Sequence, residues 1–201
     1  MALVLFDFDG TITTHETMPE FLRRSISRQR LVLGWILLAP VVLGYKVGLV
    51  PGHLVRRVIV RFAYTGMPAS ELAVRGQDFA ENRLPHVLRP EAMERIAWHR
   101  AQGHQVVVVS GGLDVYLRPW CEAQDLDLVC SRLQVRNGRL TGRYEGRQCV
   151  LAEKARQVRN SYDVDAFSEI YAYGDTAEDR DLLAMASRRF YRWREVPATP
   201  V

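Results

Sequence analysis

The chain has 201 residues, of which 48% are hydrophobic and 25% are charged, and its formal net charge is +4. This composition supports a packed core, so it excludes a disordered chain and a small scaffold stapled by disulfides. The length suits one domain with or without a smaller inserted one, and the mild positive charge is too small to indicate a nucleic-acid-binding protein.

The cysteines and the N-terminus bear on the cellular compartment. Cys121, Cys130 and Cys149 are odd in number and show no CxxC spacing, so we expect reduced thiols rather than disulfides or a metal site. The first residues, MALVLFDFDG, begin a strand at once and contain neither a basic region nor a cleavage site of the kind that signal peptides carry. Both features predict a cytoplasmic protein.

Three short apolar runs predict the strands of a buried sheet. They cover residues 2–7, 105–109 and 169–173, and each ends at glycine and polar residues. Each is followed by a helix-like stretch: 16–25, 113–124 and 177–186. This alternation predicts an α/β fold, a doubly wound parallel sheet, with strand 2–7 between the other two. Ligands of such sheets bind at the carboxyl ends of the strands, so we expect the functional site there.

A long insertion separates the first two strands. It contains no convincing buried strand and predicts several helices, broken at Pro40, at Pro51-Gly52 and at Gly66-Met67-Pro68. The predicted division of the chain is therefore an all-helical insertion at 15–88 and an α/β core made of 1–14 and 89–201.

Smaller features are predicted elsewhere. Asn137-Gly138 between two alternating segments predicts a β-hairpin over 133–144, because both residues tolerate the positive φ of a type I′ turn. The sequence RRFYRWRE at 188–195 alternates arginine with aromatic residues and predicts an edge strand rather than a nucleic-acid-binding segment. Ser70 is expected to cap one helix, and Pro90 to stand in the first turn of another.

Carboxylates follow two of the predicted strands. Asp7 and Asp9 end the first strand, and their spacing of two directs both side chains toward the same region. One carboxylate can attack a phosphoryl group while the other handles the proton of the leaving oxygen. Asp175 offers a further carboxylate at a neighbouring strand end, and oxygen ligands of this kind suit Mg²⁺.

Groups that can hold a phosphate come from other segments. Ser110 offers a hydroxyl, and Gly111 leaves its backbone N–H open to close approach. Lys154 begins the predicted helix 150–161 and would supply a positive charge. Only Lys46 and Lys154 are lysines among the 27 basic residues, which favours a specific need for an ammonium group at Lys154.

In chain order, these residues resemble the haloacid dehalogenase superfamily of phosphatases across essentially the whole chain. The resemblance rests on four motifs: Asp7-Phe8-Asp9-Gly10-Thr11, Ser110, Lys154, and Gly174-Asp175 with Asp179. It implies a Rossmann-like core with the helices of 15–88 as a cap over the site. It also implies a Mg²⁺-dependent phosphomonoester hydrolase that passes through an aspartyl-phosphate intermediate.

The resemblance also assigns roles to single residues. Asp7 would be the nucleophile and Asp9 the general acid and base. Mg²⁺ would be held by Asp7, the backbone carbonyl of Asp9 and Asp175, and Asp179 would orient Lys154. The residues assigned to phosphate binding are Thr11, Ser110, Gly111 and Lys154.

Within the superfamily the chain is most similar to the phosphoserine phosphatase branch. Glu16 matches that branch's substrate-contacting glutamate, and Arg56 or Arg57 lies where the branch carries an arginine for the substrate carboxylate. Glu178 departs from the branch, which has an asparagine there, because an ionised carboxylate cannot donate a hydrogen bond to phosphate. The chain similarly resembles phosphatidylglycerophosphatase C-like proteins, whose caps carry a hydrophobic stretch.

The inserted segment contains one such apolar run. Residues 31–45 carry no charge, and arginines stand on both sides. Fifteen residues are fewer than the roughly 20 that a spanning helix needs. Three alternatives stay open: buried cap core, contact of residues 31–61 with an anionic membrane surface, and a true span. The second would place the protein on the inner face of the membrane.

The leading functional hypothesis is thus a phosphatase with a hydrophobic or lipid-like phosphomonoester as substrate. A small metabolite such as phosphoserine is the alternative substrate. A catalytically silent binding module of the same fold is the non-enzyme alternative, and phosphotransfer to an alcohol shares the same intermediate. No nucleic-acid partner is expected.

Overall fold

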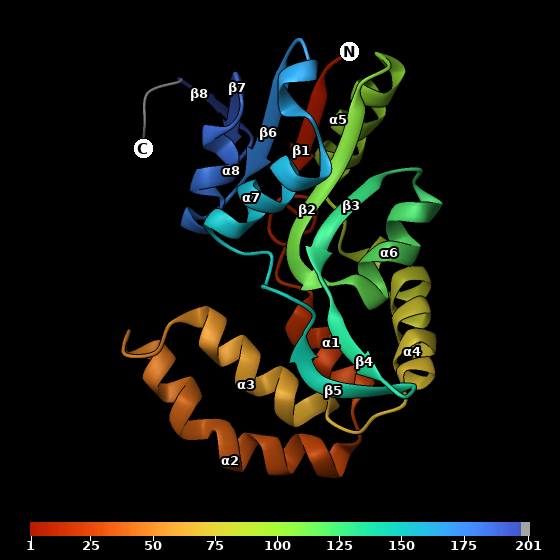
Figure 1. Ribbon diagram of the computed structural model, residues 1–201, viewed down its shortest axis with the longest axis vertical. Helices are drawn as coiled ribbons and strands as arrows, with labels where there is room; N and C mark the ends of the chain where they lie inside the picture. The colour runs from red at the N-terminus through yellow and green to blue at the C-terminus, as the bar shows by residue number, and fades with distance from the viewer. Residues whose placement is uncertain (198–201) are drawn as a thin grey trace.

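A computed structural model describes residues 1–197 of the chain (Figure 1). Its centre is a six-stranded sheet in the order β3-β2-β1-β6-β7-β8. All neighbours are parallel except β7 and β8, and β1 lies between β2 and β6 as predicted. The strands are β1 (Leu3–Phe6), β2 (Gln105–Leu113), β3 (Asp127–Ser131), β6 (Ile170–Gly174), β7 (Arg188–Tyr191) and β8 (Arg194–Val196).

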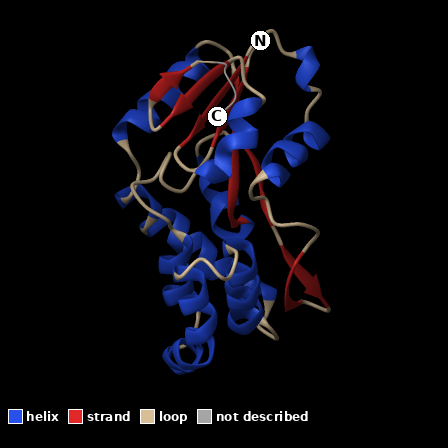
Figure 2. Ribbon diagram, turned by 90° about the vertical axis from the view of Figure 1, so that its left-hand side faces the viewer, coloured by secondary structure: helices blue, strands red, loops and turns tan. Residues whose placement is uncertain are grey.

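Helices cover both faces of this sheet, as Figure 2 shows. Because side chains alternate along a strand, Val4 and Phe6 face one hydrophobic core while Leu3 and Leu5 face the other. Helices α5 and α6 pack in the first core, and α7 and α8 in the second. Their bounds are α5 (Pro90–Ala101), α6 (Asp114–Ala123), α7 (Ala152–Ser161) and α8 (Arg180–Ala184). The predicted doubly wound α/β fold is confirmed.

The segment between β1 and β2 is helical, as expected. It consists of α1 (Met18–Ser25), α2 (Arg28–Lys46), α3 (Gly52–Tyr64), α4 (Ala69–Asn82) and the short 3₁₀ helix η1 (Leu84–His86). In Figure 1, α2 and α3 form an antiparallel pair beyond the carboxyl ends of the strands, and α4 lies against α6.

Two details of this segment were predicted wrongly. Helix α2 does not break at Pro40 but continues through it. Pro40 lies on the exposed side of the helix, where a carbonyl without its N–H partner can face water. Ser70 does not cap α4, because the helix already begins at Ala69. The N–H of Ala69 instead donates to the carbonyl of Gly138, 2.9 Å away.

The predicted β-hairpin is confirmed as β4 (Leu133–Arg136) and β5 (Arg139–Tyr144), with φ values of 50° at Asn137 and 73° at Gly138. It lies along α3 and bonds to the α3–α4 loop, where the N–H of Gly66 donates to the carbonyl of Leu140. The edge strand predicted at 188–195 is instead two strands, β7 and β8. Arg192 and Trp193 both have positive φ and turn the chain between them.

Within residues 1–197, no helix is long and apolar enough to cross a membrane. The apolar run of residues 31–45 lies within the part of the chain that the structure describes. Helix α2 contains this run but belongs to the helical pair described above.

Candidate active site

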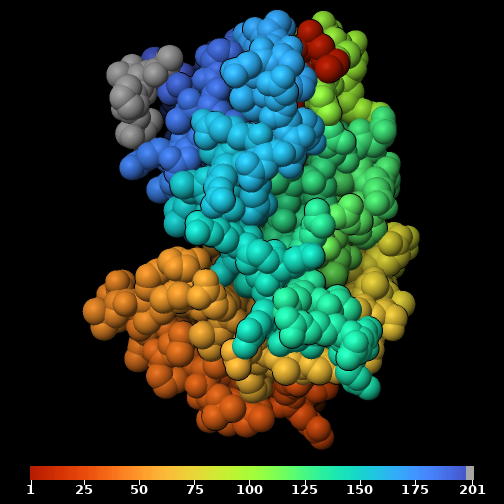
Figure 3. Space-filling view, viewed as in Figure 1, coloured from red at the N-terminus to blue at the C-terminus, as the bar shows by residue number. Residues whose placement is uncertain are grey.

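A cleft of about 630 Å³ lies between the carboxyl ends of β1, β2 and β6 and the helices α1–α3. Its floor carries the predicted polar residues of the strand ends. Its opposite wall is mostly apolar and comes from α1, α2 and α3, through Met18, Pro19, Leu22, Tyr45, Val55 and Ile59. Figure 3 shows the molecule hollowed on its left side, between the orange helices and the blue part of the core.

Lys154 joins two carboxylates on the floor of the cleft. It stands in the first turn of α7, and its Nζ donates to Asp7 Oδ1 at 2.5 Å and to Asp179 Oδ1 at 2.6 Å. All three side chains are buried. Burial raises the pKa of Asp7, against the influence of Lys154. Burial alone would lower the pKa of Lys154, but the two carboxylates hold it above its ordinary value, so the ammonium stays charged.

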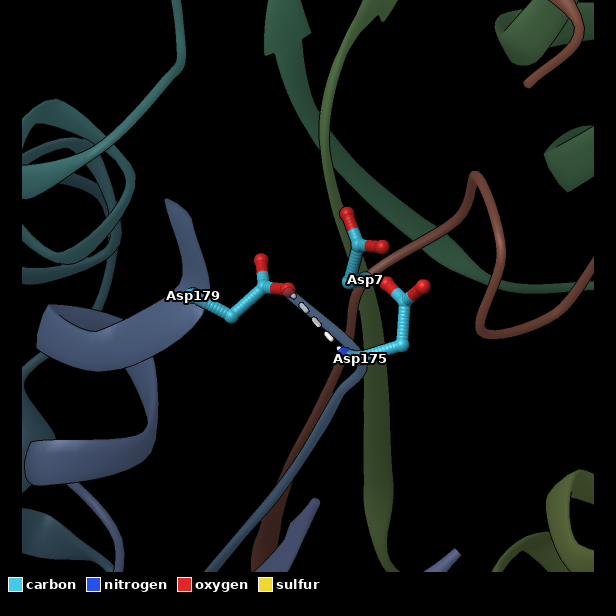
Figure 4. A group of neighbouring side chains, drawn as sticks. All are labelled: Asp7, Asp175 and Asp179. Carbon is cyan, nitrogen blue, oxygen red and sulfur yellow. Dashed lines mark hydrogen bonds between the residues drawn. The ribbon is translucent and has the colours of Figure 1, made fainter. Parts of the chain in front are cut away.

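Asp7, Asp175 and Asp179 form a cluster in which one oxygen from each lies within 4.8 Å of the others (Figure 4). Both oxygens of Asp179 are engaged: one accepts from Lys154, and the other accepts from the N–H groups of Asp175 and Thr176. Asp7 and Asp175 therefore offer the free lone pairs. Three carboxyl groups against one ammonium group leave an excess of acidic groups, which a divalent cation can balance. The donor set fits Mg²⁺.

Asp9 is held by Thr17 at the start of α1. Its Oδ1 accepts from the backbone N–H of Thr17 at 2.8 Å and from the Thr17 hydroxyl at 2.7 Å. The same hydroxyl lies 3.3 Å from the Tyr116 hydroxyl of α6. Burial raises the pKa of Asp9, while the two Thr17 hydrogen bonds act in the opposite direction. These contacts fix the Asp9 carboxyl at the cleft wall beside Asp7.

Ser110 and Gly111 line the cleft at the end of β2. The sequence predicted that the strand ends before them, but β2 continues to Leu113, with a register shift against β3 between Ser110 and Leu113. In this irregular part of the strand, Gly111 lies too close to Val150 for a side chain, since a Cβ there would stand 2.8 Å from Val150 Cγ1. The Ser110 Oγ accepts from the N–H of Gly112 at 3.0 Å, so its own hydrogen is free to point into the cleft.

Gly10 and Thr11 support Asp175. Gly10 has a φ of 82°, and a Cβ there would clash with the Asp175 carboxylate. The buried Thr11 hydroxyl donates to Asp175 Oδ1 at 3.4 Å. Thr11 is not among the residues that line the cleft. The structure thus places Thr11 next to Asp175 and outside the residues that line the cleft.

The predicted substrate contacts divide into two groups. Glu16 and Arg56 line the cleft, whereas Arg57 points outward from α3 and does not. Arg56 is already paired, since its Nη1 lies 3.1 Å from Glu178 Oε2. Glu178 belongs to the 3₁₀ helix η3 (Ala177–Asp179), which follows β6. Burial alone would lower the pKa of Arg56, but Glu178 raises it, so Arg56 stays a cation.

Two residues that hold parts of the site in place were not predicted from the sequence. Thr17, described above, had no local signal for its contact with Asp9. Arg89, which precedes α5, lines the cleft, and its Nε donates to the carbonyls of Gly10 at 3.2 Å and Thr13 at 3.0 Å. It ties down the loop that follows Asp9. The sequence shows Arg89 directly before Pro90, but no motif predicts its hydrogen bonds to Gly10 and Thr13.

The chain matches the family of haloacid dehalogenase-like hydrolases over residues 4–184. It is 32% identical over 199 residues to Protein CicA from Caulobacter vibrioides, which covers 98% of this chain and 88% of CicA. It is 36% identical over 98 residues to a phosphoserine phosphatase from Archaeoglobus fulgidus, covering 47% of this chain and 28% of that protein. The chain belongs to the haloacid dehalogenase-like hydrolases, as predicted.

Solved structures show the same fold. A protein of unknown function from Bordetella pertussis Tohama I has a TM-score of 0.80 and 22% identity, covering 94% of this chain and 89% of that one. A phosphoserine phosphatase in the form of a phospho-aspartyl intermediate analogue has a TM-score of 0.66 and 23% identity, covering 94% and 85%. Together with the Archaeoglobus relative, these matches confirm the predicted similarity to the phosphoserine phosphatase branch.

Proposed function

We propose that this hydrolase is a Mg²⁺-dependent phosphatase that forms an aspartyl-phosphate on Asp7. The observation that carries the proposal is the Lys154 ammonium between Asp7 and Asp179, beside the Asp175 carboxylate. A buried nucleophile paired with a fixed cation, next to a divalent-metal donor set, suits attack on an anionic phosphate. The solved phospho-aspartyl analogue of a phosphoserine phosphatase with the same fold supports this reading.

The proposed reaction has two displacements. First, an Asp7 carboxylate oxygen bonds to phosphorus, the bond from phosphorus to the ester oxygen breaks, and that oxygen takes the proton of Asp9 as the alcohol leaves. Second, Asp9 removes a proton from water, the water oxygen bonds to phosphorus, and the acyl-phosphate bond breaks. Inorganic phosphate and the free Asp7 carboxylate result, and Asp9 is protonated again. An alcohol in place of water would give phosphotransfer.

Asp7, Asp175 and the backbone carbonyl of Asp9 are the groups we assign to Mg²⁺. When bound there, Mg²⁺ would screen the charge between the phosphate and the Asp7 carboxylate. Ser110 and the N–H of Gly111 are assigned to the phosphoryl oxygens, together with Lys154. We reassign Thr11 from the phosphate to support of Asp175, because its hydroxyl donates to that carboxylate.

The substrate class we favour is a hydrophobic phosphomonoester. The wall that faces the catalytic floor is lined by apolar side chains of three helices, among them Leu22, Tyr45 and Ile59. Burying an acyl chain there is worth about 0.8 kcal/mol per methylene. A zwitterion such as phosphoserine would need free partners for its charges, and Arg56 is already committed to Glu178.

Phosphoserine remains the second candidate substrate, because the Archaeoglobus relative is a phosphoserine phosphatase and Glu16 lines the cleft. The deciding measurement is kcat/KM for phosphoserine against a lysophosphatidate of short chain length. A higher value for the lysophosphatidate supports our assignment. A higher value for phosphoserine replaces it with the small-metabolite alternative.

The test of the chemistry itself uses Asp7→Asn and the matched surface variant Asp165→Asn. We expect Asp7→Asn to lower turnover of a general phosphomonoester by at least about a thousandfold, since an amide is a poor nucleophile. Asp165 is exposed on the far side of the core, and its variant should keep normal turnover. Trapping of phosphate on the protein, read by mass spectrometry, should be lost in Asp7→Asn alone. Normal turnover in Asp7→Asn would refute the mechanism. If the unaltered protein folds normally but turns over no phosphomonoester, the result would favour the catalytically silent binding module.

A further inference from the structure

Helix α2 presents apolar side chains to solvent along most of its length. Trp35 is 69% exposed and Ile36 is 68% exposed. Its buried side packs chiefly on α3, where Gly34 approaches the ring of Phe62. The other exposed large hydrophobic residues of α2 and the turn after it are Val32, Leu33, Leu37, Leu43, Tyr45, Val47 and Leu49. An apolar surface of this extent on a folded protein indicates an interaction site.

The charge of the surrounding segment is strongly one-sided. Residues 21–70 contain no aspartate or glutamate, and their basic residues are Arg23, Arg24, Arg28, Arg30, Lys46, Arg56, Arg57 and Arg61. The rest of the chain carries 19 basic and 23 acidic residues, so its net charge is −4. The positive charge of the protein is thus concentrated on the helices that carry the apolar surface.

Many of these cations are uncommitted. Among residues 1–197, the side chains of Arg23, Arg28, Lys46, Arg57 and Arg61 have no hydrogen bond or ion pair. Arg57 and Arg61 share the outward face of α3 with the exposed Leu54. Apolar side chains flanked by free basic ones are the pattern of a helix that lies in a membrane interface.

A groove between α2 and α3 combines both chemistries. It has a volume of about 710 Å³, and its walls include Leu33, Val58 and Phe62 with the guanidinium groups of Arg30 and Arg61. Arg30 is anchored by hydrogen bonds to the carbonyls of Ala63 and Thr65, whereas Arg61 is free among the described residues.

We propose that the surface formed by α2, the turn 47–51 and the outward face of α3 docks on a bilayer that contains anionic phospholipid. Acyl chains would take up the exposed apolar side chains, and the lipid phosphates would meet the free arginines. The charge argues against a second copy of this chain as the occupant, because two surfaces without any acidic residue would repel each other.

The docking surface reaches the mouth of the cleft. Tyr45 is half exposed in the last turn of α2 and also lines the cleft, and a Cβ at Gly52 would lie 3.4 Å from its ring. Val47 and Leu49 lie exposed in the adjoining turn. In Figure 1 this turn joins α2 and α3 at the left of the molecule, on the same side as the hollow in Figure 3. Docking would therefore bring the mouth of the cleft to the membrane. There the cleft could receive a membrane-borne phosphomonoester, and this step rests on the proposed function.

Co-sedimentation with vesicles tests the docking without any measurement of activity. The probe is the full chain mixed with vesicles of phosphatidylcholine alone or with about one third phosphatidylglycerol. We expect binding to the anionic vesicles only. Salt at 0.5 M should weaken this binding at least about tenfold, because it screens the attraction between the basic side chains and the lipid phosphates. Absence of binding to anionic vesicles, with normal turnover of a soluble phosphomonoester, would overturn the docking and leave the proposed function intact.

Matched variants locate the surface. Leu49→Glu is compared with Val74→Glu, since Leu49 is 81% exposed and Val74 of α4 is 71% exposed outside the surface. Arg57→Glu is compared with Arg159→Glu, because Arg159 is also exposed, on α7. We expect about a tenfold loss of vesicle binding in the first member of each pair and little change in the second. Equal loss in both members would overturn the assignment, as would a dimer in solution that Leu49→Glu dissociates.

Discussion

The Arg56 guanidinium of α3 lies 3.1 Å from the Glu178 carboxylate of η3, so an ion pair joins the helical segment to the sheet edge across the cleft. Both partners line the cleft. The pair holds Arg56 away from any carboxylate that a substrate brings.

Replacing Glu178 should therefore change substrate preference. We expect Glu178→Gln to raise kcat/KM for phosphoserine about two- to fivefold relative to a phosphate ester of a simple alkyl alcohol, because Arg56 becomes free. The effect is modest because the ion pair is partly exposed. The measurement is the ratio of kcat/KM for the two substrates. Glu195→Gln, which breaks the exposed pair with Arg188 on the far edge of the sheet, is the control and should leave the ratio unchanged. An unchanged ratio in Glu178→Gln would show that the ion pair has no part in selection.

Thr17 should act on catalysis through Asp9 alone. Thr17→Val keeps the side-chain shape but removes the hydroxyl that lies 2.7 Å from Asp9 Oδ1, so the general acid loses one of its two fixed donors. We expect kcat to fall about tenfold with little change in KM. Thr17→Ser keeps the hydroxyl and should restore most of kcat. If serine fails to restore it while the melting temperature is normal, packing by the methyl group and not the hydrogen bond is what matters.

Gly10 should be required for its lack of a side chain. In Gly10→Ala the new Cβ would collide with the Asp175 carboxylate, so we expect turnover to fall at least about a hundredfold. Gly103→Ala is the control, because Gly103 also has a positive φ, of 70°, but a Cβ there meets nothing within 4 Å. That variant should cost about 1 kcal/mol of stability and leave turnover intact. Similar turnover in both variants would exclude a steric effect at Asp175.

The sequence was informative where chain geometry alone brings residues together. Asp7 and Asp175 follow parallel strands and Ser110 lies near the carboxyl end of a third, so their convergence could be predicted from the order of the strands. Thr17 could not be predicted, because the loop between it and Asp9 has no regular period. The same holds for Arg89, which bonds to Gly10 across 79 residues. Such contacts depend on how helices pack on the sheet edge, which no local pattern encodes.

Magnesium should be detectable by its effect on folding as well as on activity. Because Asp7, Asp175 and Asp179 crowd negative charge, we expect Mg²⁺ to raise the melting temperature of the apo protein and EDTA to abolish turnover. Asp175→Asn should raise the Mg²⁺ concentration that gives half of this shift at least about tenfold. The exposed Asp165→Asn is the control. A melting temperature that ignores Mg²⁺ in the unaltered protein would contradict the assigned metal site.

His99 should make stability depend on pH. It is fully buried in α5, its Nε2 lies 2.8 Å from the Tyr173 hydroxyl and its Nδ1 lies 2.9 Å from His104, while Arg95 and Arg188 are nearby. Burial first, then these cations, lower its pKa to about 3. The unfolded chain protonates His99 below about pH 6.5 and the folded one does not, so its contribution is complete above pH 6.5 and falls as the pH drops toward 3. Between pH 7 and pH 5 this amounts to about 2 kcal/mol. Urea denaturation at pH 7 and at pH 5 should show a smaller loss of unfolding free energy in His99→Gln and the full loss in the exposed His86→Gln. An equal loss in these two variants and in the unaltered protein would exclude His99 as the source of the pH dependence.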